Sequence, residues 1–340
     1  MHPHLLALPF VLLALALALV LFLNVRGSGF EVRRVRRSRF GVRRLTFDVS
    51  RLIPLSWSDL SLYAICLGGL GFLNTWDFPT YLFVVVAAFA LASYHRTHRF
   101  EVRRVLALTL VLAVGGFLLY LPFWIGFRSQ AGGLLPNLFN PTRLPQFLVM
   151  FGPLLLPVVG VAVAAARRQG VKAEQVAVTT AALLAGAALF LLLAVLLTPQ
   201  GRQYVDAWRS GGPIPGLEHI PDAPRLIGQR LLERVLTPWT ALALAALLTT
   251  ALLALLRPAP LRPATAYALL LVLTGALLTL AVEFVYLRDV FGTRMNTVFK
   301  FYFQTWALWG IAGAYGLARW LGRGDTRGEV LSLIHISEPT

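Results

Sequence analysis

The chain has 340 residues, of which 57% are hydrophobic and 14% are charged, and its mean hydropathy is +0.71. This composition excludes a soluble globular domain and indicates a protein that crosses a membrane several times. The net charge of +16 does not indicate a nucleic-acid partner, because the basic residues lie in short loops and no basic soluble domain is present. The single cysteine, Cys66, lies in an apolar segment, which excludes a disulfide framework and a cysteine-based metal site.

Nine apolar runs are predicted to cross the membrane, since a spanning helix needs about 20 mainly apolar residues. The first run has no basic segment before it and no small-residue cleavage site after it, so we expect it to stay in the protein as a span. The predicted fold is an all-α, polytopic transmembrane bundle of residues 1–330. In chain order the expected spans are Pro3 to Leu23, Ser58 to Leu73, Pro79 to Tyr94, Val105 to Phe127, Phe147 to Ala166, Val176 to Thr198, Trp239 to Leu256, Ala264 to Val285 and Phe301 to Trp320.

The distribution of arginine predicts the orientation. Short loops rich in Lys and Arg stay on the cytoplasmic side, and most of the 31 such residues fall in alternate loops if the N-terminus is extracytoplasmic. The inside loops are then RGSGFEVRRVRRSRFGVRR, HRTHRFEVRR, RRQGVK, RPAPLRP and the tail, where they meet anionic lipid headgroups. We therefore expect a multi-pass protein of the plasma membrane, with the lipid bilayer as a partner. The pair Ser58 to Tyr94 could instead form a re-entrant hairpin, which leaves the other loops on the same sides.

Three polar motifs fall on the predicted extracytoplasmic side. His2 and His4 begin the first span in HPHLLALPF. The motif NTWDFPTY joins the second span to the third, and EFVYLRDVFGTRMNTVFKFYFQTW joins the eighth to the ninth. The unusual polar residues of an apolar chain are thus expected to share one face.

In NTWDFPTY, the polar residues are predicted to lie below the headgroups. The apolar runs on either side are only about 16 residues, or about 24 Å of helix, so Asn74, Trp76 and Asp77 should be drawn into the bilayer. Pro79 and Thr80 suit the first turn of the returning helix. An aspartate at this depth is costly unless it is paired, hydrated or bound to a cation, so we expect Asp77 to face a cavity. Two interpretations stay open: Asp77 only caps the helix, or it caps the helix and also has a functional role.

The last motif carries a polar stripe into the ninth span. Asn296, Lys300 and Gln304 recur at i, i+4 and i+8, which places them on one face of a helix. Aromatic and aliphatic side chains occupy much of the remaining surface. We predict that the stripe lines a substrate-binding site.

The same motif offers a cluster of cations. Arg288, Arg294 and Lys300 together suit a phosphate or pyrophosphate, which arginine can bind bidentately. Glu283 and Asp289 could pair with these cations. Two interpretations stay open here as well: a purely structural network of salt bridges, or a network that also binds an anionic headgroup.

Two outside loops are long enough to fold at the membrane surface. Pro199 to Pro238 mixes Pro and Gly turns with an amphipathic helix expected near Arg225 to Leu236, and it resembles an interfacial flap. Glu218 and His219 are adjacent in this loop, but two residues do not by themselves make a metal site. Gly126 to Gln146 is a loop of the same kind, and neither loop carries a nucleotide-binding motif.

The motifs HPHLLALPF, NTWDFPTY and, above all, YLRDVFGTRMNTVFKFYFQTWAL resemble those of the DUF2298 family of membrane proteins, over nearly the whole chain. Members of this family are similar to the GT-C class of glycosyltransferases, which take sugars from polyprenyl-phosphate donors on the extracytoplasmic face. The resemblance therefore implies a polyprenyl-phosphate sugar donor as a partner. It implies functional roles for the matching residues His2, His4, Asn74, Trp76, Asp77, Thr80, Arg288, Asp289, Arg294, Asn296 and Lys300.

Both ends of the chain depart from the family pattern. Members have further spans upstream, whereas Met1 stands directly before the histidine motif. We therefore expect the chain to be the C-terminal part of a larger protein, with the key acidic residue of the first outside loop of GT-C enzymes in the missing part. The last ten residues, Leu331 to Thr340, resemble translated sequencing adapter and are expected to be a non-native tail.

Two functional classes follow from these residues. In a GT-C-like transferase, Arg288, Arg294 and Lys300 hold the donor phosphate, while Asp77 or Asp289 orients an acceptor hydroxyl or a divalent cation. The alternative is a transporter or flippase for a similar anionic lipid, which uses the cations without a base. Inverted repeats would favour the transporter, and the lack of a second NTWD motif favours the enzyme.

Overall fold

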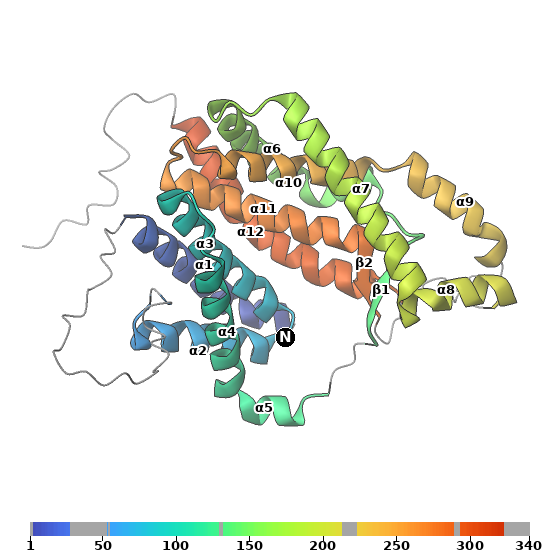
Figure 1. Ribbon diagram of the computed structural model, residues 1–340, viewed down its shortest axis with the longest axis horizontal. Helices are drawn as coiled ribbons and strands as arrows, with labels where there is room; N and C mark the ends of the chain where they lie inside the picture. The colour runs from blue at the N-terminus through green and yellow to red at the C-terminus, as the bar shows by residue number, and fades with distance from the viewer. Residues whose placement is uncertain are drawn as a thin grey trace, which may run out of the picture.

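A computed structural model of the chain describes residues 3–27, 53, 55–128, 132–212, 223–288 and 293–322. These residues form a bundle of helices with one pair of short strands (Figure 1). The elements are α1 (Pro3–Gly27), α2 (Trp57–Leu73), α3 (Asp77–Thr97), α4 (Val102–Leu119), α5 (Leu121–Gly126), β1 (Leu134–Pro136), α6 (Leu144–Arg168), α7 (Ala173–Leu197), α8 (Pro199–Ser210), α9 (Ala223–Leu236), α10 (Trp239–Leu256), α11 (Pro263–Phe284), β2 (Val285–Leu287) and α12 (Met295–Leu321).

The helices confirm an all-α, polytopic membrane fold. In the described part of the chain, seven of them are long and apolar enough to cross a bilayer: α1, α3, α4, α6, α7, α10 and α11. Helix α2 is apolar but shorter, with 17 residues, and α12 has 27 residues with the polar motif in its first turns. The run Val105 to Phe127 is divided at Tyr120 between α4 and α5, because Pro122 cannot continue the hydrogen-bonding pattern of the first helix.

The strands β1 and β2 form a small antiparallel ribbon that the sequence did not predict. Leu134 pairs with Leu287 and Pro136 with Val285. The hydroxyl of Tyr204 on α8 donates to the Pro136 carbonyl at 2.9 Å. The ribbon therefore ties the loop before α6 to the end of α11. The amphipathic helix expected near residues 225–236 is confirmed as α9, whereas α8 was not predicted.

Helices α11 and α12 run side by side through the middle of the bundle (Figure 1). The Trp309 side chain of α12 is fully buried, and its Nε1 donates to the Val272 carbonyl of α11 at 3.1 Å. Gly275 permits this contact, because a Cβ atom there would lie 2.3 Å from Trp309 Nε1 and 2.7 Å from Cδ1. The close packing of the two helices fixes the position of the polar residues of α12 relative to those of α11.

We expect Gly275→Ala to lower the free energy of unfolding by about 1–3 kcal/mol, because the added methyl group overpacks a rigid ring that has no free space. Denaturant titration in detergent micelles measures the loss. Gly310→Ala is the matched control on α12, since no atom lies within 4 Å of its Cβ position. An equal effect of the two substitutions would contradict the packing argument.

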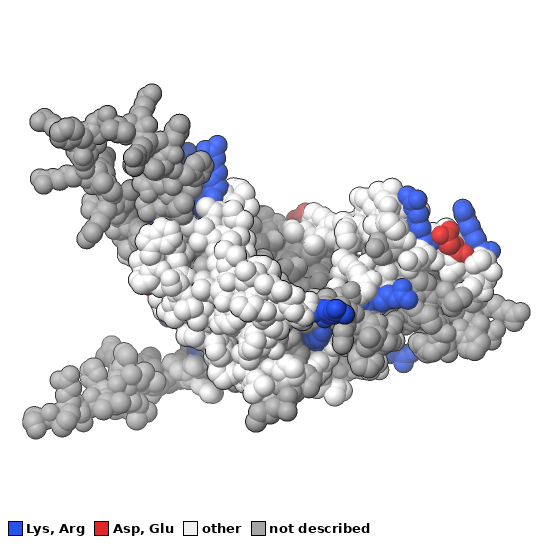
Figure 2. Space-filling model, turned by 90° about the horizontal axis from the view of Figure 1, so that it is seen from below, with Lys and Arg blue, Asp and Glu red and all other residues white. Residues whose placement is uncertain are grey.

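The last turn of α1 and the described residues of three loops that are predicted to be cytoplasmic lie together at one end of the bundle. There, Arg26 donates to the Leu261 carbonyl, His95 Nε2 donates to the Leu255 carbonyl at 2.8 Å, and Gln169 Nε2 donates to Ala259 at 3.0 Å. The opposite end, called the polar end below, holds the first turns of α3, α6, α10 and α12 and the last turn of α11. On the face in Figure 2 most of the described side chains are uncharged, and Lys and Arg appear in a few separate places.

Candidate functional site

Polar residues gather at the polar end in two clusters, both of which include side chains of α12. The Asp77 cluster consists of Asn74, Trp76, Asp77, Tyr81, Lys300 and Gln304. The Glu283 cluster consists of Asn137, Thr142, Arg234, Glu283, Arg294 and Tyr302.

Asp77 binds two amide donors from different parts of the chain. It is the first residue of α3, while Trp76 occupies the N-cap position, and its side chain is fully buried. Asn74 Nδ2 donates to Asp77 Oδ1 at 2.6 Å, and Gln304 Nε2 donates to the same oxygen. The carboxylate therefore links the α2–α3 connection to α12, a contact that a helix cap alone does not require. Its position at the helix N-terminus also favours the negative charge.

Tyr81 orients the amide that reaches Asp77. The Tyr81 hydroxyl donates to Gln304 Oε1, and both side chains are buried. Because the amide oxygen of Gln304 is held by this hydroxyl, its NH₂ group faces the carboxylate. Asp77, Gln304 and Tyr81 thus form a chain of hydrogen bonds between α3 and α12.

Lys300 brings a cation to the same cluster. Its Nζ lies 4.8 Å from the centroid of the Trp76 ring, a distance at which the ring face attracts an ammonium group. The charges of Lys300 and Asp77 also attract each other. Asn74, Trp76 and Lys300 are half-buried, whereas Asp77 is fully buried. These three side chains are therefore more accessible than the carboxylate.

The Glu283 cluster is built around a buried ion pair. Arg294 Nη1 lies 3.0 Å from Glu283 Oε1, and the two side chains are 13% and 2% exposed. The same nitrogen donates to the Val282 carbonyl at 3.0 Å, and Arg294 Nη2 donates to Thr142 Oγ1 at 2.9 Å. Both terminal nitrogens of Arg294 are thus occupied by protein acceptors.

Thr142, just before α6, donates two further hydrogen bonds to the Glu283 carboxylate. Its backbone N–H donates to Glu283 Oε2 at 2.9 Å, and its hydroxyl donates to Oε1. The Tyr302 hydroxyl lies 3.3 Å from the Thr142 hydroxyl, and Thr240 Oγ1 donates to the Thr142 carbonyl at 2.7 Å. Because both carboxylate oxygens are bound, the pair is compensated within the protein. This geometry favours the structural interpretation of Arg294.

Arg234 joins this cluster from α9. Its Nη2 donates to the Glu283 carbonyl at 2.7 Å, and its guanidinium lies 5.7 Å from the centroid of the Phe284 ring. Its Nη1 is buried and has no hydrogen-bond partner among the described residues. Burial also lowers the pKa of Arg234, because a low-dielectric surrounding disfavours the charged form.

The predicted site residues are thus divided between two clusters. Lys300 is directed to Trp76 and Arg294 to Glu283, while Asn296 is half-buried in the first turn of α12. Thr80 Oγ1 donates to the Trp76 carbonyl at 3.3 Å. The Arg288 backbone extends the ribbon by donating to the Gly133 carbonyl at 2.9 Å. Lying outside the described residues are His2, Glu218, His219, Asp289, the side chain of His4 and the tail 331–340.

Sequence reasoning missed the residues that come from other parts of the chain. Asn137 and Thr142 lie in a loop without periodicity, and Arg234 lies on the predicted amphipathic helix as one of several arginines. Asn137 Nδ2 donates to the Glu283 carbonyl at 3.1 Å. The Pro-Thr pair before α6 is the only local sign of a special residue at position 142. For a metal, the described residues contain no group of three or more His, Cys, Asp or Glu side chains that could hold an ion.

The model of the DUF2298 family, described as an uncharacterized membrane protein, matches residues 1–309. The chain belongs to the DUF2298 family. Neither the curated proteins nor the solved structures gave a match. In this DUF2298 protein the match includes every residue of both clusters and ends at Trp309, the side chain that packs on α11.

Proposed function

We propose that this DUF2298 protein is a glycosyltransferase of the GT-C type that uses a polyprenyl-phosphate-linked sugar on the extracytoplasmic face of the plasma membrane. The observation that carries the proposal is the Asp77 cluster, where a buried carboxylate and an ammonium group meet at the polar end. Transfer from such a donor needs positive charge at the leaving phosphate and a base near the acceptor. The resemblance of the motifs to this class of enzyme supports the same assignment.

In the proposed step, the bond between the anomeric carbon of the sugar and the phosphate oxygen breaks. The electron pair leaves with the polyprenyl phosphate, and Lys300 stabilises the charge that develops on it. The acceptor hydroxyl forms the new glycosidic bond and gives its proton to Asp77. An alternative role for the carboxylate is to bind a divalent cation, which carboxylate oxygens favour.

Access to Asp77 is proposed to involve Asn74. This residue lies in the short connection between α2 and α3, and its amide covers Oδ1 of the carboxylate. Movement of the Asn74 side chain opens a path for the acceptor, while Gln304 keeps Asp77 in place from the α12 side. Trp76 then holds the Lys300 ammonium beside the entering donor.

The Glu283 cluster is assigned a supporting role. It joins α11, α12, α9 and the segment before α6, and so keeps the N-terminal end of α12 in place. Arg288 and Asp289, which follow β2 directly, remain candidates for contacts to the donor phosphate and the acceptor.

We expect Lys300→Ala to weaken the binding of a polyprenyl-phosphate sugar by about 1.5–3 kcal/mol, the range for hydrogen bonds to charged groups. Binding is measured as the shift in thermal stability of the protein in nanodiscs upon addition of polyprenyl-phosphate mannose or glucose, relative to the uncharged polyprenol. Lys300→Arg should retain most of the shift, because it retains the charge.

The other lysine of the chain provides a control. Lys172 precedes α7 at the opposite end of the bundle, so Lys172→Ala should leave the shift unchanged. Equal stabilisation by polyprenol and by every phosphate-linked sugar would contradict the proposal. Movement of the intact donor across a proteoliposome membrane, with the bond between sugar and phosphate uncleaved, would replace it with the transporter.

A further inference from the structure

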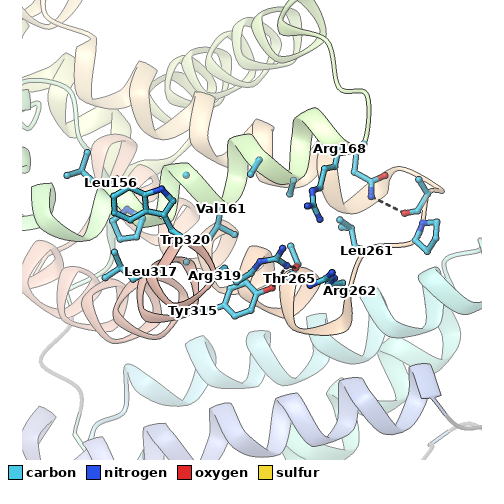
Figure 3. A pocket seen from close by; sticks show the side chains of 18 of the residues that line it. Leu156, Val161, Arg168, Leu261, Arg262, Thr265, Tyr315, Leu317, Arg319 and Trp320 are labelled. Atoms are coloured by element: carbon cyan, nitrogen blue, oxygen red, sulfur yellow. Dashed lines mark hydrogen bonds between the residues drawn. The ribbon is translucent and has the colours of Figure 1, made fainter. Parts of the chain in front are cut away.

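A cavity of 660 Å³ lies at the end of the bundle opposite the Asp77 cluster (Figure 3). It opens between α6, α12 and the segment that joins α10 to α11. Most of its wall is apolar and comes from α6 and α12, but three arginines, Arg168, Arg262 and Arg319, also line it. Because the cavity has an apolar wall and three positive charges, it suits an amphiphilic ligand rather than a purely apolar one.

Among the described residues, no acidic side chain compensates the charge of the cavity. No acidic side chain lines it, and none of its three arginines forms an ion pair within the described part of the chain. Arg168 and Arg262 are exposed, so their guanidinium groups can turn toward a ligand. An anion is therefore the expected partner, and guanidinium groups bind phosphate oxygens bidentately.

Arg319 is held in place at the wall of the cavity. Its Nη1 donates to Thr265 Oγ1 and to the Tyr315 hydroxyl, each at 3.2 Å. Its Cζ also lies 5.9 Å from the centroid of the Tyr315 ring. These contacts fix the guanidinium before any ligand arrives, which lowers the entropic cost of binding.

Gln169 adds a hydrogen-bond acceptor to the wall of the cavity. The residue is 9% exposed and lines the cavity, and its Nε2 donates to the Ala259 carbonyl at 3.0 Å. Its Oε1 is buried and has no hydrogen-bond partner among the described residues. A buried acceptor in this state requires a donor, so a ligand that carries a hydroxyl group next to its anion would satisfy it.

The charged and the apolar residues of the cavity lie on different sides, as the headgroup and the acyl chain of a lipid would require. Figure 3 shows Arg168, Arg262 and Arg319 toward one side and Leu156, Leu317 and Trp320 toward the other. Along α6 the lining extends from Pro153 to Arg168, roughly 22 Å of helix. One leaflet of the hydrocarbon core is about 15 Å thick, so the lining is long enough for a headgroup and the upper part of an acyl chain.

We propose that this cavity binds an anionic phospholipid with a hydroxyl-bearing headgroup, of which phosphatidylglycerol is the simplest example. The phosphate lies among the three arginines, a headgroup hydroxyl donates to Gln169 Oε1, and an acyl chain follows the apolar wall of α6. The site is at the end that the arginine distribution predicts to be cytoplasmic, where basic pockets between helices meet anionic lipids. The inference is independent of the transfer reaction proposed for the polar end.

Native mass spectrometry of the protein released from detergent tests the site, with phosphatidylglycerol and phosphatidylcholine of identical acyl chains as probes. We expect tighter binding of phosphatidylglycerol and a loss of about 10-fold or more in the double variant Arg168→Ala, Arg262→Ala. Arg167→Ala is the matched control, because this neighbouring arginine is exposed but does not line the cavity. Ala164→Phe, which fills the apolar part without changing charge, should also weaken binding of phosphatidylglycerol.

Three outcomes would overturn the inference. Equal affinities for the two lipids would remove the role of the anion, and an equal loss in Arg167→Ala would show that surface charge alone binds the lipid. Full displacement of phosphatidylglycerol by millimolar inorganic phosphate, together with an unchanged affinity in Ala164→Phe, would show a site for a small anion rather than for a lipid.

Discussion

Replacing Arg294 with alanine is expected to lower the free energy of unfolding by about 3–5 kcal/mol, whether or not a lipid donor is present. The substitution leaves the Glu283 carboxylate buried without its cation, since this side chain is only 2% exposed. It also removes the donors to the Val282 carbonyl and to Thr142. Denaturant titration in detergent, with and without a polyprenyl-phosphate sugar, measures the loss.

A surface ion pair provides the control. Arg104 and Glu101 lie 2.7 Å apart with side chains 29% and 27% exposed, so Glu101→Ala should cost less than about 1 kcal/mol. Arg294→Lys should recover only part of the stability, because lysine retains the charge but loses the planar fork. Near-normal stability of Arg294→Ala, combined with a loss of stabilisation by the donor, would show that Arg294 binds phosphate instead.

The second large effect is expected on the rate of sugar transfer when Asp77 is replaced. Asp77→Asn should lower the rate of sugar transfer by at least about 100-fold, the lower range for general acid–base catalysis. The fold should be retained, because the asparagine carbonyl can still accept from Asn74 and Gln304. The loss of a negative charge at the N-terminus of α3 should cost only about 0.3–1 kcal/mol. Release of polyprenyl phosphate from a labelled donor measures turnover in nanodiscs.

Asp77→Leu separates the two roles of this residue. It leaves the amide donors of Asn74 and Gln304 without an acceptor, so it should lower both turnover and the free energy of unfolding, the latter by about 1–3 kcal/mol. If Asp77→Asn turns over as fast as the unchanged protein, Asp77 has a structural role only and is not the base.

The sequence was a good guide to the fold because the bilayer restricts the possible structures. A spanning segment must satisfy its own backbone hydrogen bonds, so each long apolar run becomes a helix. The ribbon was not predicted, since strands of three residues show no periodicity and Val285 was assigned to a span. Helix α8 does have a local signal in the sequence: Thr198 accepts from the Gly201 N–H at 2.9 Å as the N-cap, and Pro199 follows it.

The candidate site could be predicted only where one helix carries it. The spacing of Lys300 and Gln304 placed both on one face of α12, and both belong to the Asp77 cluster. The partners of Glu283 were not predictable, because Thr142 and Arg234 reach it through the packing of α6 and α9 and not through any local pattern. The single motif of cations therefore became two clusters: Arg294 forms an ion pair with Glu283, whereas Lys300 lies beside the Trp76 ring.

The central claim, that a polyprenyl-phosphate sugar binds at the polar end beside Asp77 and Lys300, is tested most directly by photocrosslinking. A polyprenyl phosphate with a diazirine next to its phosphate is added to the protein in nanodiscs, and the labelled peptides are identified by mass spectrometry. We predict labels at residues 71–80 and 293–304, with competition by a polyprenyl-phosphate sugar and a strong reduction in Lys300→Ala. Labels confined to other segments, or labels at these segments that Lys300→Ala leaves unchanged, would contradict the account.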